Sequence, residues 1–156
     1  MSDKRDLIHV VLVEPEIHWN TGNAGRTCLA AGARLHLVEP LGFSLEAPEV
    51  RRAGLDYWPH VRPRIWRSWQ TLESKLAEMG TLILFSPNAE RTLWQANLTP
   101  PCVLVFGSEN RGLAPEILRA YQERSVRIPQ ESETVRSLNL STCVGIAVYE
   151  ALRQGK

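Results

Sequence analysis

The sequence predicts an α/β protein in which a mostly parallel sheet is flanked by helices. Short apolar runs alternate with helical patterns along most of the 156 residues. Two runs, Leu82–Phe85 and Val103–Phe106, are apolar throughout, which is typical of parallel strands buried on both faces. No repeat, low-complexity tract or linker interrupts this alternation, so we expect a single domain over residues 1–156.

The first half opens with a strand at Leu7–Val13, where three valines supply the β-branched bulk that strands favour. A helix is expected at Asn23–Ala31, with Asn20 or Thr21 available as its cap. The second strand follows at Leu35–Val38 and ends in a turn built on proline and glycine.

Further helices are expected at Ala47–Ala53, which has a proline in its first turn, and at Ser68–Met79, which is amphipathic and ends at a glycine. After the two buried strands, the pattern predicts a helix at Ala114–Tyr121 and a strand at Ser125–Ile128. The final helix, Leu138–Arg153, is apolar on most sides and is therefore expected to be deeply buried.

Two common nucleotide-binding signatures are missing from the sequence. The first strand ends Val13-Glu14-Pro15-Glu16, with no glycine-rich turn, and GxxxxGK[ST] does not occur. These observations exclude an ordinary NAD fold and a P-loop protein, and they argue against the common Rossmann-type methyltransferase. A nucleotide-like ligand would have to bind at the glycine loops of the C-terminal half.

The net charge of +1 identifies no partner, but the basic residues are uneven in kind. Only Lys4, Lys75 and Lys156 are lysines, and the other 15 of the 18 basic residues are arginines. Arginine suits bidentate contact with phosphate and stacking on rings, which hints at an anionic ligand.

Cys28, Cys102 and Cys143 are odd in number and form no CxxC pair. We interpret them as free thiols that pack as small apolar side chains, which fits a cytoplasmic protein. The histidines show no ligand spacing against the cysteines, so we expect no metal. No apolar run approaches the ~20 residues of a membrane span, and no signal peptide is visible at the N-terminus.

The stretch NTGNAGR places Asn20, Asn23 and Arg26 at the start of the predicted helix. Asn23 and Arg26 are three residues apart and share a face, so an anion there would meet a helix N-terminus and a guanidinium. The alternative is a helix cap with a surface arginine.

A buried strand leads into a loop that carries a carboxylate, an amide and a guanidinium in VLVFGSENRGL. Gly107 would allow a ligand to approach the backbone closely. Glu109 could accept hydrogen bonds from hydroxyls or from an arginine, and the alternative is a tight turn with a solvated ion pair.

The third stretch begins at the strand end Ile128-Pro129 and reaches the last helix through Ser137-Leu138-Asn139. Ser137 or Asn139 could cap that helix. Polar residues at the mouth of a buried helix could also touch a ligand.

A fourth stretch, RRAGLDYWPHVRPRIWRSW, interleaves five arginines with Tyr57, Trp58, Trp66 and Trp69. Arginine with aromatic residues grips phosphates and stacks on unpaired bases. The alternative is that the tryptophans anchor the core or an interface. As candidate RNA contacts we single out Arg51, Arg52, Arg64 and Arg67.

Taken together and in this order, NTGNAGR, RRAGLDY, FGSENRGL and IPQ…RSLNLS…GIAVYEA resemble the SPOUT-class RNA 2′-O-ribose methyltransferases. The resemblance covers nearly the whole chain and is nearest to the small bacterial tRNA (cytidine/uridine-34-2′-O)-methyltransferases of the TrmL type. It implies an α/β sheet with a C-terminal trefoil knot, a homodimer, and S-adenosylmethionine bent into the knot. The substrate would be the wobble nucleotide of certain tRNAs, those for leucine among them.

The resemblance also implies roles for individual residues. The cofactor would be held around Phe85, Gly107, Ile128, Ser137 and Leu138. Arg26 would act at the ribose 2′-hydroxyl, and the residues that position it and the substrate would be Asn20, Glu109, Ser137 and Asn139. Because a guanidinium is effectively always protonated, Arg26 is better suited to bind the adjacent phosphate than to act as a base.

Two positions depart from the pattern of this family. His18-Trp19 stands where relatives often have two prolines, and Ser86-Pro87-Asn88 replaces a threonine-rich loop that contains lysine. Other readings remain open: methylation of another tRNA position or of ribosomal RNA, a non-catalytic RNA-binding module, or a hydrolase with Glu109 as general base. The hydrolase lacks an evident nucleophile and partner acid, and no GxSxG occurs.

Overall fold

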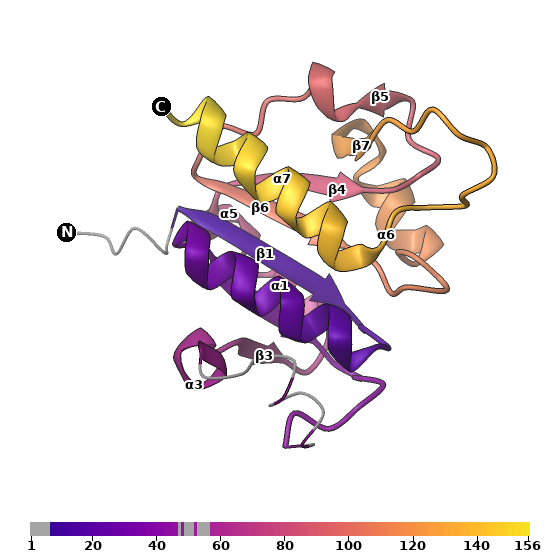
Figure 1. Cartoon of the computed structure of the whole chain (residues 1–156). Coiled ribbons are helices and arrows are strands. Elements are labelled where there is room, and N and C mark those ends of the chain that lie inside the picture. The colour runs from indigo at the N-terminus through magenta and orange to yellow at the C-terminus, as the bar shows by residue number, and fades with distance from the viewer. Residues whose placement is uncertain (1–6, 47, 49–51, 53–56) are drawn as a thin grey trace.

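The computed structural model describes residues 7–46, 48, 52 and 57–156. Seven strands form one sheet in the order β3-β2-β1-β6-β4-β7-β5, and all neighbouring pairs are parallel (Figure 1). The strands are β1 Ile8–Val13, β2 Arg34–Val38, β3 Arg64–Trp66, β4 Thr81–Phe85, β5 Arg91–Thr92, β6 Cys102–Phe106 and β7 Ser125–Arg127. The predicted α/β class and the parallel sheet are therefore confirmed.

The five predicted strands are all present, each within one residue of its expected ends. The two that the sequence did not reveal, β3 and β5, lie at the two edges of the sheet. They have only three and two residues: Arg-Ile-Trp, with the first two exposed, and Arg-Thr, with the arginine exposed. Such short segments carry no alternation of apolar and polar residues that could identify them as strands.

Helix α1 spans His18–Ala31 and begins five residues before the expected start. Its N-cap is Ile17, which makes no capping side-chain bond, so the prediction that Asn20 or Thr21 caps this helix is wrong. Both side chains lie inside the helix and are buried, with Asn20 4% and Thr21 0% exposed. Their polarity is typical of a cap, but burial against the rest of the fold decides their position.

The expected helix Ser68–Met79 is divided into α4, Trp69–Glu73, and α5, Leu76–Met79. At the break, the Ser74 hydroxyl donates a hydrogen bond to the Thr71 carbonyl at 2.8 Å. Such a local bond offers the backbone an alternative to the helical ladder.

The remaining helices include α6, Pro115–Ala120, and α7, Leu140–Gln154, close to their predicted places. Helix α3, Trp58–Val61, was not expected. Most of the helix predicted at Ala47–Ala53 lies outside the described residues. Single 3-10 turns, η3 and η4, occur at Leu93–Gln95 and Gln122–Arg124.

Helices cover both faces of the sheet. On the face turned to the viewer in Figure 1, α1 and α7 lie side by side over a core that includes Leu12, Leu104 and Val148. On the other face, Trp69, Leu72 and other residues of α4, α5 and α6 pack against alternate residues of the same strands. The cysteines are free, Cys28 and Cys102 buried and Cys143 half-buried, as expected.

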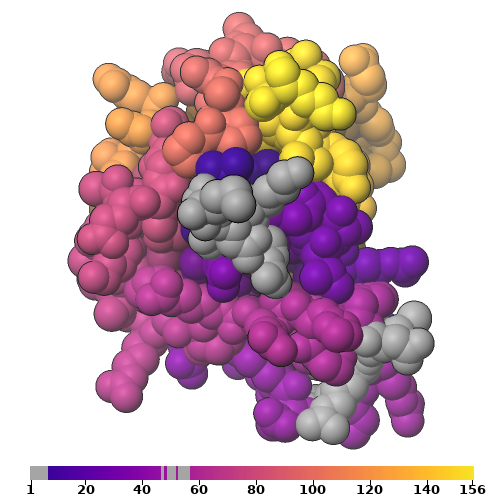
Figure 2. Space-filling view, turned by 90° about the vertical axis from the view of Figure 1, so that its left-hand side faces the viewer, coloured from indigo at the N-terminus to yellow at the C-terminus, as the bar shows by residue number. Residues whose placement is uncertain are grey.

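The last turn of α7 is held at the N-terminal ends of the strands, the side seen in Figure 2, where its yellow end lies beside residues 96–100. Gln154 accepts a hydrogen bond from the backbone of Leu98 at 2.7 Å and donates one to the carbonyl of Ala96 at 3.2 Å. These bonds fix α7 at this end, so that its N-terminus lies at the opposite edge, among the loops that follow the strands. No helix in the described part of the chain is long and apolar enough to cross a membrane.

Candidate functional site

A pocket of about 400 Å³ lies at the carboxyl ends of the strands. Four segments build it, and each follows a strand: the start of α1 after β1, residues 86–88 after β4, the loop 107–113 after β6, and residues 128–140 after β7. This edge is where ligands bind in open parallel sheets. The structure therefore brings together three of the four stretches that the sequence analysis singled out.

The floor of the pocket is aromatic. Phe85 and Phe106 are register partners at the last positions of β4 and β6. Their rings are stacked, with centroids 4.6 Å apart and planes within 10° of parallel. Ile128 and Leu138 add apolar surface to the lining. This combination can receive a flat, apolar ring system.

Gly107 is required by the loop itself. A Cβ atom at this position would lie 2.1 Å from the carbonyl carbon of Gly112 and 2.2 Å from the nitrogen of Leu113. The loop returns on itself through a bridge between Ser108 and Gly112. The expectation that Gly107 leaves room for a ligand is thus corrected: the returning backbone fills that space, although Gly107 still lines the pocket.

Glu109 closes the N-terminus of α1 and forms no solvated ion pair. Its Oε1 accepts a hydrogen bond from the backbone N–H of Glu16 at 2.8 Å, and its Oε2 accepts one from that of Ile17 at 2.7 Å. The Asn20 amide donates a third bond to Oε2 at 3.1 Å. A carboxylate 92 residues away in sequence thus satisfies donors that a helix start leaves free.

This arrangement corrects the phosphate site expected at NTGNAGR. The backbone donors before α1 already bind Glu109. Arg26 lies in the third turn of the helix, not its first. Glu109 is also a poor candidate for a general base, because both of its carboxylate oxygens already accept hydrogen bonds.

Asn139 joins the two helix starts. It is the N-cap of α7, and its Oδ1 accepts hydrogen bonds from the backbone N–H groups of Ser141 and Thr142 at 2.9 and 3.3 Å. Its Nδ2 donates to Oδ1 of Asn20 at 2.9 Å. The chain Asn139–Asn20–Glu109 therefore spans one side of the pocket, and Asn139 both caps its helix and faces the site.

Glu16 is held against the same loop. The Asn110 amide donates to its Oε2 at 2.9 Å, and Arg111 Nε lies 3.6 Å from its Oε1. These contacts, the Asn110 bond first, hold the pKa of Glu16 below its usual value. The loop 107–113 is thus attached to the segment before α1 by two carboxylates.

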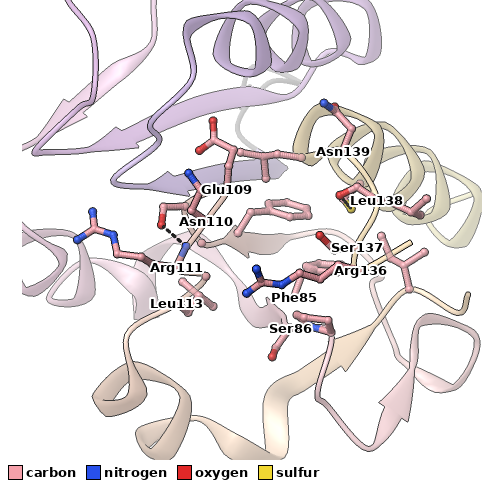
Figure 3. Close-up of a pocket in the computed structure, with 18 of the residues that line it drawn as sticks. Phe85, Ser86, Glu109, Asn110, Arg111, Leu113, Arg136, Ser137, Leu138 and Asn139 are labelled. Carbon is pink, nitrogen blue, oxygen red and sulfur yellow. Dashed lines mark hydrogen bonds between the residues drawn. The ribbon is translucent and has the colours of Figure 1, made fainter. Parts of the chain in front are cut away.

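All five expected cofactor residues, Phe85, Gly107, Ile128, Ser137 and Leu138, line the pocket, as do Asn20, Glu109 and Asn139. Figure 3 shows Phe85, Ser137, Leu138 and Asn139 on one side and Glu109 on the other. Arg26 is not among the lining residues. It is exposed on α1, with its guanidinium carbon 5.5 Å from the centre of the Tyr57 ring.

The fourth stretch has a mixed outcome. Trp66 and Trp69 are buried, 7% and 8% exposed, so for these two the core interpretation is right. Arg64 and Arg67 are exposed, and the guanidinium of Arg64 lies 4.5 Å from the centre of the Trp66 ring. Arg52 is exposed, and Arg51 lies outside the described residues. None of the three described arginines, Arg52, Arg64 and Arg67, lines the pocket.

Sequence reasoning missed several residues of the site, including Leu113, Leu118 and Arg136. Arg136 precedes Ser137 in a motif that was noticed, so position alone could have suggested it. Leu118 comes from α6 on the other side of the loop, and only the fold brings it there. The described residues contain no group of three or more His, Cys, Asp or Glu that could hold a metal ion.

Known proteins share this sequence and fold. The family model described as "SpoU rRNA Methylase family" matches residues 7–149. A tRNA (cytidine(34)-2′-O)-methyltransferase of Burkholderia pseudomallei is 43% identical over 150 residues, which cover 95% of this chain and 96% of that protein. A similar enzyme of Polaromonas sp. is 42% identical and covers 95% of this chain and 91% of its own.

Solved structures agree. One described as "Structural insights into the 2-OH methylation of C/U34 on tRNA" has a TM-score of 0.88 and 44% identity, covering 94% of this chain and 95% of its own. An rRNA methyltransferase of Sinorhizobium meliloti, solved with AdoMet bound, has a TM-score of 0.80 and 26% identity. The match covers 97% of this chain and 60% of the Sinorhizobium meliloti chain.

Proposed function

The chain belongs to the SpoU rRNA methylase family, and we propose that it transfers the methyl group of S-adenosylmethionine to the ribose 2′-hydroxyl of nucleotide 34 of tRNA. The trefoil knot follows from this fold and stays an expectation for this chain. The observation that carries the proposal is the pocket itself: three of the stretches that the sequence analysis singled out meet there, and its lining has the chemistry that this cofactor needs.

The residues present fit S-adenosylmethionine. The Phe85–Phe106 stack and the side chains of Ile128 and Leu138 offer an apolar slot for the adenine. Strand ends and loops leave backbone groups at the rim that can bond ribose and methionyl groups. When bound, S-adenosylmethionine supplies the methyl group from its sulfonium sulfur.

The polar chain Asn139–Asn20–Glu109 positions the site and does not react. Each of its side chains has its oxygen atoms engaged by partners within 3.3 Å. Such a framework fixes the starts of α1 and α7 and the loop 107–113 relative to one another. In-line transfer to a hydroxyl depends on that alignment, which can supply much of the rate acceleration. Ser137 lies beside this framework, and its hydroxyl would contact cofactor or substrate.

Arg26 would bind the phosphate next to the target ribose and orient the 2′-oxygen, with the proton leaving through phosphate or water. In one subunit Arg26 does not reach the pocket. We therefore propose that a homodimer forms and that Arg26 serves the pocket of its partner subunit.

The face of α1 and α7 that points away from the sheet supports this dimer. Trp19 and Tyr149 are 52% and 54% exposed. Trp19, Asn23 and Arg26 are spaced four and three residues apart and are all exposed, so they form one stripe on α1. Large exposed apolar side chains of this kind are typical of an interface between subunits.

Heterodimers test the shared site. Arg26→Ala is co-expressed with Leu138→Glu, a pocket variant that should not bind cofactor, each with its own affinity tag. If Arg26 acts on the partner's pocket, a heterodimer has one intact site and regains about half of the wild-type activity. If Arg26 acts within its own subunit, both sites are defective and the heterodimer stays inactive.

Contacts with the rest of the tRNA are proposed at Arg51, Arg52, Arg64 and Arg67. On the resemblance alone, leucine tRNAs are the proposed substrates. The proposed compartment of the reaction is the cytoplasm. Pure leucine tRNA compared with another acceptor tests this specificity. Equal methylation of both would remove the preference and leave the reaction.

Transfer of labelled methyl groups from S-adenosylmethionine to tRNA and, separately, to ribosomal RNA tests the function. Label in tRNA alone is expected. Label in ribosomal RNA would agree with the family but would make ribosomal RNA, not tRNA, the substrate. RNA binding without transfer, unaffected by Arg26→Ala and by cofactor, would favour the binding module.

A further inference from the structure

Arg136 has no role in the account so far, although it lies in the pocket. It comes from the loop that leads from β7 to α7, directly before Ser137 and Leu138. Its side chain extends from that loop into the pocket, near Phe85 (Figure 3). No hydrogen bond or ion pair holds its guanidinium among the described residues.

The charges around the pocket are unequal. Its lining has two cations, Arg111 and Arg136, and one acid, Glu109. Glu109 is satisfied by the start of α1, and Arg111 is paired with Glu16 at 3.6 Å. The guanidinium of Arg136 is therefore the positive charge in this pocket that has no anion.

We propose that Arg136 binds the carboxylate of the methionyl part of S-adenosylmethionine, an inference that rests on the proposed function. This carboxylate is the one anionic group of the ligand. A carboxylate that enters a pocket loses water and needs a charged or hydrogen-bonding partner. The guanidinium offers two parallel N–H donors that match the two oxygens of a carboxylate.

The position of Arg136 fits this role. The adenine slot is formed by Phe85, Phe106, Ile128 and Leu138, and Arg136 reaches the same pocket from the residue two before Leu138. Because Arg136 lies near Phe85 of the adenine slot, it would hold the carboxylate of a ligand that is bent within the pocket. The sulfonium between the adenine and the carboxylate is then held in one place, as in-line transfer requires.

A phosphate of the RNA is the competing partner for this guanidinium. The two partners predict different results when the cofactor is bound without RNA. Binding of S-adenosylhomocysteine, which keeps the carboxylate, and of decarboxylated S-adenosylmethionine, which lacks it, is therefore measured by calorimetry for wild type and Arg136→Gln. Arg119→Gln is the matched control, because Arg119 is exposed on α6 and does not line the pocket.

Arg136→Gln is expected to raise the Kd for S-adenosylhomocysteine by about 10- to 100-fold, the usual effect of losing a hydrogen bond to a charged group. The affinity for the decarboxylated ligand should not change, and Arg119→Gln should match wild type with both ligands. Arg136→Lys should fall between, because it keeps the charge and loses the fork.

Four results would overturn the assignment, the second of them seen when tRNA binding is measured beside calorimetry. Equal loss for both ligands would mean that Arg136 only supports the shape of the pocket. Unchanged S-adenosylhomocysteine affinity with weaker, less salt-dependent tRNA binding would assign Arg136 to a phosphate. Wild-type protein that binds neither ligand would remove the proposed function, whereas wild-type binding with no effect of Arg136→Gln would remove this inference alone.

Discussion

Asn139 donates a hydrogen bond to Asn20 at 2.9 Å across 119 positions of sequence. Through it, the start of α7 is tied to the start of α1, and Asn20 in turn donates to Glu109 in the loop after β6. Three segments that are distant in sequence thus meet at one edge of the sheet. The proposed methyl transfer depends on this framework more than on any single reactive side chain.

Asn139→Asp should separate capping from alignment. An aspartate caps a helix as well as an asparagine but cannot donate to Asn20. We expect the helix cap to be kept, a modest loss of unfolding stability because the buried Asn20 oxygen loses its donor, and a lower kcat for methyl transfer. Asn139→Ala should lose about 1 kcal/mol of stability as well. Wild-type kcat in Asn139→Asp would show that the bond to Asn20 does not matter for the reaction.

Glu109→Gln should destabilise the fold. The new amide nitrogen must face at least one of the donors that now point at the carboxylate, the N–H groups of Glu16 and Ile17 and the Asn20 amide. Loss of hydrogen bonds to a charged group costs about 1.5–3 kcal/mol. Denaturant unfolding measures the change, and Glu116→Gln on the exposed side of α6 is the control. A stability equal to that of the control would contradict the capping role.

Gly107→Ala should abolish cofactor binding. The added methyl would meet the backbone of Gly112 and Leu113 at 2.1 and 2.2 Å, so the loop must open. The control is Gly145→Ala in α7, where nothing lies within 4 Å of the added atom. Calorimetry with S-adenosylhomocysteine should show binding in the control and none in Gly107→Ala. Normal affinity in Gly107→Ala would show that the loop can repack.

The free energy of unfolding should decrease at acidic pH because of a buried histidine that lies away from the pocket. Trp66 Nε1 donates to His36 Nδ1 at 3.0 Å, and His36 Nε2 lies 2.9 Å from His9 Nδ1. Burial first, then the charges of His9, Arg64 and Arg34, lowers the pKa of His36 to about 3. In the unfolded chain the ring takes up a proton near pH 6.5. Below that pH, down to about 3, the unfolded state binds more protons than the folded one.

The free energy of unfolding should therefore decrease as pH falls from about 6.5, by up to about 1.4 kcal/mol per pH unit from this group. Urea unfolding at pH 7, 6, 5 and 4 measures the slope. His36→Leu should have a smaller slope than wild type, whatever its absolute stability, whereas His60→Gln on the surface should not alter it. Equal slopes in wild type and His36→Leu would exclude His36 as the source.

Strands and motifs were predictable because each is a local pattern. The buried strands β4 and β6 are apolar runs that few other structures explain, and the loop after β6 carried more polar chemistry than a turn needs. The edge strands β3 and β5 were not predictable, since their two or three residues have no periodicity. Ser74 likewise divides a helix through one hydroxyl that a pattern of apolar residues does not register.

The sequence predicted which residues line the pocket but did not predict which atoms they contact. Residues placed by resemblance, such as Phe85 and Leu138, do line the pocket. The partners of Glu109 could not be predicted from sequence, because two of the three are backbone N–H groups 92 and 93 residues away. Arg26 shows the limit of motif reasoning, since its place relative to the pocket depends on the fold and, in our proposal, on a second subunit.

The central claim is methyl transfer to the 2′-hydroxyl of nucleotide 34. The most direct measurement compares two synthetic tRNAs that differ only in a hydroxyl or a hydrogen at that position, with labelled S-adenosylmethionine and nuclease mapping. The account predicts label at nucleotide 34 of the hydroxyl form and none in the 2′-deoxy form. Equal label in both, or label mapped to another nucleotide, would contradict it.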